Sequence, residues 1–286
     1  MSATIIDGRR IAAEIKREVL AELDQLKSIY KTNPSIASVM IGKDESSKLY
    51  LRLRDKACSD IGIQTTQHIL PEDTTEREIH GLIEELNNDS EIHGILLQLP
   101  LPKHLSLHRI LSKINPLKDV EGVTPYNIGT LITGEERIIP CTPMAVLKIL
   151  QHMEIPIEGS NIVIINHSHI VGKPLATIML NRNATVTICH IYTKNIKDYT
   201  VKADILVTAT GVPGLITEDY IKEGACVIDV GITKTSDGVK GDVDFETVKE
   251  KAGFLTPVPG GVGPVTIACS LLNMVKTFKL CMEMKK

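Results

Sequence analysis

The chain of 286 residues is long enough for one large or two medium domains, and 43% hydrophobic and 23% charged residues indicate a soluble globular protein. A net charge of −3, with acids and bases interspersed, and only 3% aromatic residues argue against a nucleic-acid-binding surface. The six cysteines are scattered without a C-x-x-C pair, which favours free buried thiols over disulfides or zinc ligands. Without a signal pattern or an apolar run approaching about 18 residues, the sequence predicts a cytoplasmic protein.

The first half of the chain alternates between predicted helices and strands. Residues 8–30 carry apolar side chains three and four positions apart, which predicts an amphipathic helix. The β-branched run 35–41, which ends in Gly42, predicts a strand. The alternation predicts a parallel sheet with right-handed crossovers. The elements predicted next are a helix over 46–61, a strand over 63–70, a helix over 74–88 and a buried strand over 92–98.

A second alternating series begins near Thr142 and predicts a doubly wound sheet, in which ligands bind at the carboxyl ends of strands. The polar, proline-rich stretch from Pro116 to Pro143 is the predicted domain boundary. A last helix begins at Val265. The predicted strands of this half are 161–166, 185–190, 205–210 and 226–230, with a helix over 172–181.

Residues 257–264 read Pro-Val-Pro-Gly-Gly-Val-Gly-Pro, which excludes a helix or a strand. This loop leads into the last predicted helix, whose free N–H groups attract anions. The pattern favours a ligand-facing loop, and a tight structural turn is the alternative.

Five motifs occur in order along the chain. They are Gln98-Leu99-Pro100-Leu101-Pro102, Asn115-Pro116-Leu117-Lys118-Asp119-Val120-Glu121-Gly122, Pro140-Cys141-Thr142-Pro143, Ile170-Val171-Gly172-Lys173-Pro174 and the loop 257–264.

Together these motifs resemble the methylenetetrahydrofolate dehydrogenase/cyclohydrolase family (FolD type) over residues 3–280. The resemblance implies a two-domain α/β fold, with a folate-binding catalytic domain over 1–140 and a Rossmann-like NAD(P)-binding domain over 141–264. It further implies that helix 265–286 packs back on the first domain, that an active-site cleft lies between the domains, and that the protein is a homodimer.

Tyr50 and Arg54 lie four positions apart on a predicted helix, so both project from one face. A solvated helix face is the alternative, and Lys56 lies well round the helix. The resemblance implies that Tyr50 and Arg54 are catalytic, but the family has a lysine at the position of Arg54. Because a guanidinium with a pKa above about 12 stays protonated, we expect Arg54 to weaken cyclohydrolase activity more than hydride transfer.

Gln98 ends a buried strand before Leu99 and Pro100, so its side chain faces a ligand or caps the strand. Glu121 stands where the family has an aspartate, and its carboxylate would accept paired N–H bonds from the pterin. The extra methylene group points to altered chemistry or to drift. The resemblance implies catalytic roles for Gln98 and Glu121, and substrate contacts by Tyr50, Gln98, Leu99, Pro100, Glu121, Pro259, Gly260 and Gly261.

The segment after the predicted strand 161–166 has the spacing of a nucleotide loop, although it lacks the first glycine of G-x-G-x-x-G. The family has arginine at the position of His167 and serine at that of Ile191, which favours NAD over NADP here because a 2′-phosphate would lack a partner. His167 and His169 have no third ligand for a metal, so no metal is predicted. The cofactor-binding residues that the resemblance implies are Asn166, His167, Ser168, Ile170, Val171, Gly172, Pro174, His190, Ile191, Thr193, Thr210, Gly211, Gly231, Ile232 and Thr266.

We therefore predict an oxidoreductase that moves a hydride between 5,10-methylenetetrahydrofolate and NAD or NADP, without nucleic-acid or membrane partners. One alternative is a fully bifunctional NADP-dependent dehydrogenase/cyclohydrolase. Another is a repurposed or inactive folate-binding homologue. The peptide bonds Leu99-Pro100 and Val258-Pro259 are predicted to be cis, mainly because of the resemblance.

Overall fold

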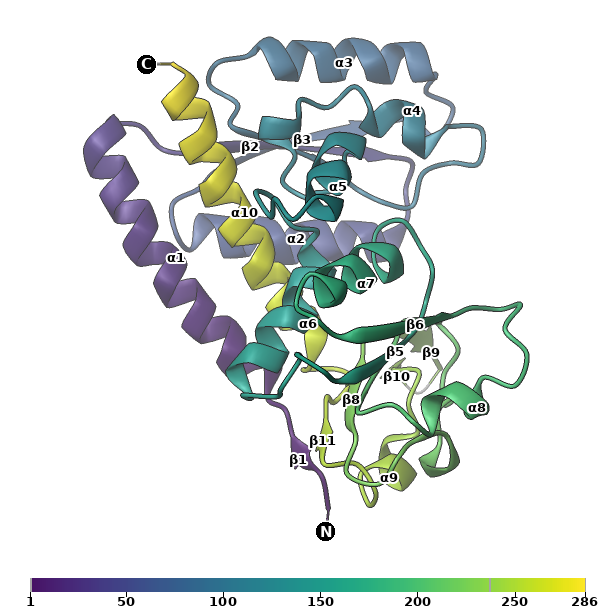
Figure 1. The fold of residues 1–286 in the computed structure, drawn as a ribbon. Coiled ribbons are helices and arrows are strands. Elements are labelled where there is room, and N and C mark those ends of the chain that lie inside the picture. Colours follow the sequence, from purple (N-terminus) through teal and green to yellow (C-terminus); the bar gives the residue numbers. More distant parts are fainter. Residues whose placement is uncertain (1, 237, 286) are drawn as a thin grey trace. The chain divides into compact units, whose positions relative to one another are not determined.

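The computed structural model describes residues 2–236 and 238–285, which divide into two compact α/β units (Figure 1). The first unit combines Met1–Glu14 with Thr142–Cys269, and the second combines Ile15–Cys141 with Ser270–Lys286. The amino-terminal residues therefore differ from the prediction, which placed all of 1–140 in one domain. The reason is that residues 4–5 pair with residues 254–255, and no local sequence pattern predicts such a long-range pairing.

This pairing joins β1 (Thr4–Ile5) to β11 (Phe254–Leu255) in parallel, and it places β1 at the edge of the sheet of the first unit. That sheet has six strands in the order β1-β11-β8-β7-β5-β6, and every pairing in it is parallel. The predicted Rossmann-like α/β class is thus confirmed. The other strands of the sheet are β5 (Asn161–Ile165), β6 (Thr185–Cys189), β7 (Ile205–Thr208) and β8 (Cys226–Asp229).

Strand β5 lies between β6 and β7, so the chain leaves it first to one side and later to the other. Such a reversal creates a crevice at the carboxyl ends of the two flanking strands, where α/β proteins bind ligands. The residues after β5 and β7 are therefore placed for binding. The remaining elements of this half are α6 (Cys141–His152), α7 (Gly172–Leu180), α8 (Lys197–Thr200), η2 (Glu218–Tyr220), α9 (Phe245–Val248) and the hairpin β9 (Thr233–Thr235) and β10 (Gly238–Lys240).

The second unit contains a parallel sheet of three strands in the order β3-β2-β4. Its central strand β2 (Ser35–Ile41) is buried at every position, and its sequence is mostly apolar without strict alternation. The neighbours are β3 (Gln64–Leu70) on one side and β4 (Gly94–Leu97) on the other. The chain therefore adds strands on both sides of β2, as it does around β5 in the first unit. Gln98 directly follows β4 and donates its backbone N–H to Val39 O at 2.8 Å.

Several helices begin where a capping residue predicts it. Helix α3 (Glu76–Asn88) starts with a complete capping box between Thr75 and Glu78. Helix α2 (Glu45–Ser59) starts after Asp44, whose side chain accepts from Ser47 N. The remaining helices are α1 (Gly8–Tyr30), α4 (Leu107–Leu111), η1 (Pro116–Lys118), α5 (Pro125–Ile132) and α10 (Val262–Met284).

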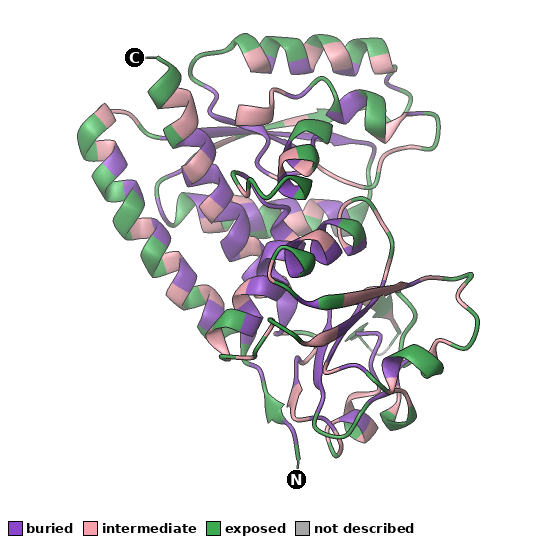
Figure 2. Ribbon diagram, viewed as in Figure 1, coloured by how far each residue is buried: buried purple, intermediate pink, exposed green. Residues whose placement is uncertain are grey.

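Helix α10 is long and apolar enough to cross a membrane by length and composition alone, which corrects the expectation that no segment approaches this length. However, 61% of its most apolar stretch is buried, as the central part of the helix shows in Figure 2. The core helix of a soluble protein passes the same test. Its apolar composition therefore fits an interior helix.

Both predicted cis peptide bonds are confirmed. Leu99-Pro100 follows β4, and Val258-Pro259 lies shortly before α10. Helix α10 begins at Val262, so the expectation that the whole segment 257–264 is non-helical was wrong for its last three residues.

His93 gives a pH-dependent expectation for stability. Its side chain is 1% exposed, its Nδ1 accepts from Ser35 N at 3.2 Å, and its ring packs against Phe278. Burial, with the charge of Lys285 as a smaller cause, lowers the pKa of His93 to about 4 from 6.5. The unfolded chain therefore takes up a proton as the pH falls through 6.5, while the folded protein does so only near 4.

We expect the free energy of unfolding to fall by on the order of 3 kcal/mol as the pH drops through this window. In His93→Asn the amide oxygen keeps an acceptor for Ser35 N without a titrating group, so this part of the loss should disappear. Urea denaturation at a series of pH values measures how the free energy of unfolding changes with pH in the wild type and in His93→Asn. The same pH dependence in both proteins would contradict the role given to His93.

Candidate active site

Helix α2 buries one face, and that face includes Arg54. Ser47, Leu51, Arg54 and Cys58 follow the helical spacing of three and four, and each is at most 5% exposed. Lys56 lies on the exposed side of the helix, and Tyr50 is half-buried. The alternative of a solvated helix face is therefore wrong for Arg54.

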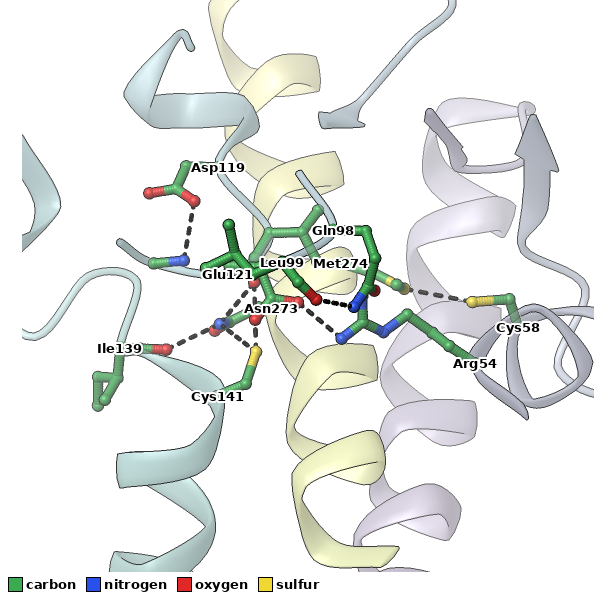
Figure 3. Close-up of polar contacts among 12 residues, drawn as sticks. Arg54, Cys58, Gln98, Leu99, Asp119, Glu121, Ile139, Cys141, Asn273 and Met274 are labelled. Carbon is green, nitrogen blue, oxygen red and sulfur yellow. Dashed lines mark hydrogen bonds and ion pairs between the residues drawn. The ribbon is translucent and has the colours of Figure 1, made fainter. Parts of the chain in front are cut away.

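The guanidinium of Arg54 lies between two other predicted site residues. Its Nη2 atom lies 2.7 Å from Glu121 Oε1, and its Cζ atom lies 4.7 Å from the centroid of the Tyr50 ring. Figure 3 shows the ion pair formed by Arg54 and Glu121, which come from distant parts of the sequence. The structure thus brings Tyr50, Arg54 and Glu121 together as one group.

This group is strongly polarised. Burial alone lowers the pKa of Arg54, but the Glu121 carboxylate more than offsets it, so the pKa lies above the usual arginine value. Burial raises the pKa of Tyr50 to about 12. Arg54 Nε and Nη1 are buried and have no hydrogen-bond partner among the described residues. A buried cation therefore stands here with two nitrogen atoms whose N–H groups no described residue accepts.

The loop that presents Glu121 is held by a neighbouring buried carboxylate. Asp119 is 1% exposed and accepts from Gly122 N at 2.9 Å, Thr124 N at 2.8 Å and Asn127 Nδ2 at 2.9 Å. Burial raises the pKa of Asp119, even though these donors favour its charged form. Asp119 thereby fixes the backbone on the carboxyl side of Glu121.

Asn273 of α10 holds the other side of this loop. Its side chain is fully buried, and its Nδ2 donates to Val120 O at 2.9 Å and to Ile139 O at 2.8 Å (Figure 3). The sequence analysis missed Asp119 and Asn273. The signal that could have identified Asn273 is a polar residue on the apolar face of the last helix.

The predicted residues after β4 form a turn beside α2. Gln98 is half-buried, and its Nε2 donates to Leu99 O at 2.8 Å. Ser47 of α2 donates to the same oxygen at 3.1 Å, which ties the cis Leu99-Pro100 turn to the helix that carries Tyr50 and Arg54. Gln98, Leu99 and Pro100 thus belong to the same part of the second unit as the ion pair.

The predicted loop residues Pro259, Gly260 and Gly261 belong to the first unit. Gly260 has a φ of 108°, a conformation that favours glycine. A Cβ atom on Gly8 would lie 1.8 Å from Gly261 O, so the start of α1 approaches this loop too closely for any side chain. Thr266, in the first turns of α10, donates to Val262 O at 3.2 Å.

A cavity of about 410 Å³ opens at the strand ends of the first unit where the chain reverses around β5. Five predicted cofactor residues line it, and its other lining residues are apolar. No lysine or arginine is among the described residues that line it. The five are Asn166, His167, His190, Ile191 and Thr210.

Asn166 organises the loop at the mouth of this cavity. Its Oδ1 accepts from Ser168 N at 2.8 Å and from Gly172 N at 3.0 Å, and its Nδ2 donates to Ala209 O at 2.6 Å. A Cβ atom on Gly172 would lie 2.0 Å from Asn166 O, so glycine is required where the loop enters α7. The Asn166 side chain and Gly172 together hold the turn between β5 and α7, where a nucleotide loop commonly has several glycines.

The two residues predicted to decide the dinucleotide follow the carboxyl ends of β5 and β6, which are neighbouring parallel strands. His167 is exposed, and its ring lies 4.8 Å from the ring of His190, between centroids. Ile191 is 85% exposed. His190 N donates to Thr193 Oγ1 at 2.8 Å, which shapes the turn that carries Ile191.

The other predicted cofactor residues are not among the residues that line the cavity. Ser168 Oγ accepts from Val171 N at 3.1 Å. Gly211 N and Gly231 N donate to buried aspartates, and Ile232 is 65% exposed. Ile170 is half-buried and Pro174 is buried in α7. Within the described parts of the chain, no group of three or more His, Cys, Asp or Glu residues is arranged to hold a metal ion.

Both halves of the chain match models of known protein domains. Residues 6–121 match the model of the tetrahydrofolate dehydrogenase/cyclohydrolase catalytic domain, and residues 140–282 match the model of the NAD(P)-binding domain of the same family. The chain belongs to the tetrahydrofolate dehydrogenase/cyclohydrolase family. It is an NAD(P)-dependent methylenetetrahydrofolate dehydrogenase of folate one-carbon metabolism.

Individual members of the family resemble the chain over nearly its full length. The "Bifunctional protein FolD" of Methanosarcina barkeri is 52% identical over 271 residues, which are 95% of this chain and 94% of that protein. A crystal structure of the bifunctional FolD enzyme from Campylobacter jejuni has a TM-score of 0.94 at 44% identity, and covers 97% of this chain and 99% of that one. The Trypanosoma brucei FolD, solved with NADP and an inhibitor, has a TM-score of 0.93 at 38% identity, with 98% of each chain covered.

In this member of the tetrahydrofolate dehydrogenase/cyclohydrolase family, the buried ion pair predicts non-additive stability effects. Glu121→Gln should destabilise the fold by on the order of 3 kcal/mol, because the Arg54 cation, 2% exposed, loses its counter-charge. Arg54→Met combined with Glu121→Gln should cost much less than the sum of the two single changes. Urea denaturation measures all four proteins, with Arg52→Met on the exposed side of α2 as control. Simple additivity would show that the two charges do not interact.

Proposed function

We propose that this enzyme transfers a hydride from 5,10-methylenetetrahydrofolate to NAD more efficiently than to NADP, and hydrolyses 5,10-methenyltetrahydrofolate more slowly than it transfers the hydride. The single observation that carries the proposal is the buried Arg54–Glu121 pair at 2.7 Å. It supplies a permanent cation beside Tyr50, where hydrolysis needs a group that gains and loses a proton.

The residues of the second unit would bind and orient the pterin. Glu121 keeps one oxygen for pterin N–H groups while the other faces Arg54. The free Nε–H and Nη1–H of Arg54 would donate to a substrate carbonyl, and Gln98, Leu99 and Pro100 would complete the contact. Hydride transfer asks for little more than alignment, since nitrogen atoms of the substrate stabilise the cation that forms.

The cavity of the first unit would hold the dinucleotide, which accepts the hydride when it is bound. A wall of apolar side chains with Asn166 and Thr210 at its edge fits an adenosine group, and the absence of a cation from the described lining residues supports NAD. The proposed cofactor set includes Ser168, Thr193 and Thr266, and the proposed substrate contacts include Gly260 and Gly261. The active-site cleft expected between the domains stays a prediction.

Initial rates with each dinucleotide, followed by the absorbance of its reduced form and by methenyl decay in parallel, test the proposal. We expect higher kcat/KM with NAD, and hydrolysis slower than reduction. Equal rates of the two reactions with a preference for NADP would establish the fully bifunctional enzyme instead. Two relatives that are 52% and 48% identical to this chain are both named as bifunctional FolD proteins, which favours that second candidate. If the protein reduces neither NAD nor NADP, it would be a folate-binding homologue without dehydrogenase activity.

The proposal also includes a homodimer that acts in the cytoplasm without a nucleic-acid or membrane partner. The thiol groups of five buried cysteines and a sixth that is half-buried are consistent with a reducing compartment. Light scattering of the purified protein measures the oligomeric state, and a monomer at working concentrations would contradict the dimer.

A further inference from the structure

Two buried carboxylates lie directly behind the strand-end turns of the first unit. Asp242 is fully buried and Asp229 is 3% exposed. Asp229 is the last residue of β8, and Asp242 follows the β9–β10 hairpin. Neither residue was predicted to belong to the site.

Asp242 holds the turn that follows β7. Its Oδ2 accepts from Thr208 Oγ1 at 2.8 Å and from Thr210 N at 2.5 Å, and its Oδ1 accepts from Gly211 N at 3.0 Å. Thr210 lines the cavity, so the carboxylate fixes the backbone of one cavity wall from behind.

Asp229 in turn holds Asp242. Its Oδ1 accepts from Gly231 N at 2.8 Å and from Asp242 N at 3.1 Å, while Oδ2 accepts from Val243 N at 2.9 Å. The turns after β7 and β8 are thus linked through two carboxylates that do not line the cavity. The register pairs Thr208 with Asp229, so the two turns begin side by side.

The two carboxylates pack closely against glycines. A Cβ atom on Gly231 would lie 2.1 Å from Asp242 Oδ1, and a Cβ atom on Gly241 would lie 2.0 Å from Asp229 Oδ2. The two carboxylates therefore occupy space that a side chain at Gly231 or Gly241 would need.

We propose that Asp242 is a positioning residue for the dinucleotide, because it fixes the Thr210–Gly211 turn against which the cofactor binds. The inference rests on the proposed function of this cavity. Asp242 does not touch the ligand and acts through the backbone of Thr210 and Gly211. A purely structural cross-link would stabilise the unit without affecting one substrate more than the other.

Asp242→Asn tests the proposal in the full-length protein. The amide group places N–H donors against at least one N–H of the turn, and bonds to a charged acceptor are among the stronger ones, so we expect the KM for NAD to rise about tenfold. The KM for methylenetetrahydrofolate should stay within about twofold. The control is Asp204→Asn, because Asp204 accepts from Asn161 N and Lys222 Nζ at the opposite end of β7. It should leave both KM values unchanged.

Equal rises in both KM values, or an unchanged KM for NAD in Asp242→Asn, would overturn the proposal. If Asp242→Asn does not fold, Thr208→Val removes a single hydroxyl donor, and we expect the KM for NAD to rise about two- to fivefold. A lowered melting temperature without that rise would show a structural role only. Wild-type protein that turns over neither dinucleotide would instead overturn the proposed function, and this inference with it.

Discussion

Replacing Arg54 with lysine is expected to raise the hydrolysis of 5,10-methenyltetrahydrofolate at least several-fold, while the rate of hydride transfer changes less. A guanidinium cannot release its proton near neutral pH, and the Glu121 carboxylate beside Arg54 raises its pKa further. An ammonium group has an ordinary pKa of about 10.4, below that of a guanidinium, and burial lowers it while Glu121 raises it. A lysine at this position can therefore release and regain a proton during hydrolysis, which an arginine cannot do.

Methenyl decay and dinucleotide reduction are measured on the same preparations of both proteins. The control is Arg52→Lys, the same substitution two residues earlier on the exposed side of α2, and it should change neither rate. Hydrolysis by the lysine variant should also vary with pH where that of the wild type does not. A wild type that already hydrolyses the methenyl compound as fast as it transfers the hydride would refute this reasoning.

Replacing His167 with arginine and Ile191 with serine together is expected to shift the NADP/NAD ratio of kcat/KM by more than tenfold. Both residues line the same cavity, which has no cation among its described lining residues. The arginine would add paired donors and the serine a hydroxyl donor for a 2′-phosphate, and each charge-assisted bond contributes roughly 1.5–3 kcal/mol.

Kinetics with both dinucleotides measure this ratio for the wild type and the double variant. His169→Arg is the matched control, because it adds the same charge to the same loop at an exposed residue outside the cavity lining. It should shift the ratio far less. A wild type that already prefers NADP by about tenfold would mean that the phosphate has a partner elsewhere.

The sequence predicted elements whose stabilising contacts are local or whose burial is uniform. The buried run of β2 and the amphipathic pattern of α1 were predicted with the bounds that the structure has. Strand β1 could not be predicted, because two residues carry no pattern and their only support is pairing with β11 at the far end of the chain. The hairpin β9–β10 was missed because its strands have three residues each, are largely exposed and carry no apolar pattern.

The candidate site divides in the same way. The spacing of Tyr50 and Arg54 placed both on one helix face, but only the structure shows that Arg54 is buried and pairs with Glu121. Asn273 and Asp242 act through backbone groups distant in the sequence, so the sequence does not show which groups they bind. The resemblance supplied residue roles, and tertiary structure supplied the contacts that hold those residues in place.

The Asn273 side chain has a consequence for how this protein can be divided into parts. Its two hydrogen bonds satisfy the carbonyl groups of Val120 and Ile139 within the second unit, although residues 270–286 are encoded after the whole of the other unit. A gene fragment that ends at Cys141 would leave both carbonyl groups without this donor beside Glu121. An independently folding half therefore needs the last 17 residues supplied again, either as a separate peptide or through a short linker that joins them to the fragment.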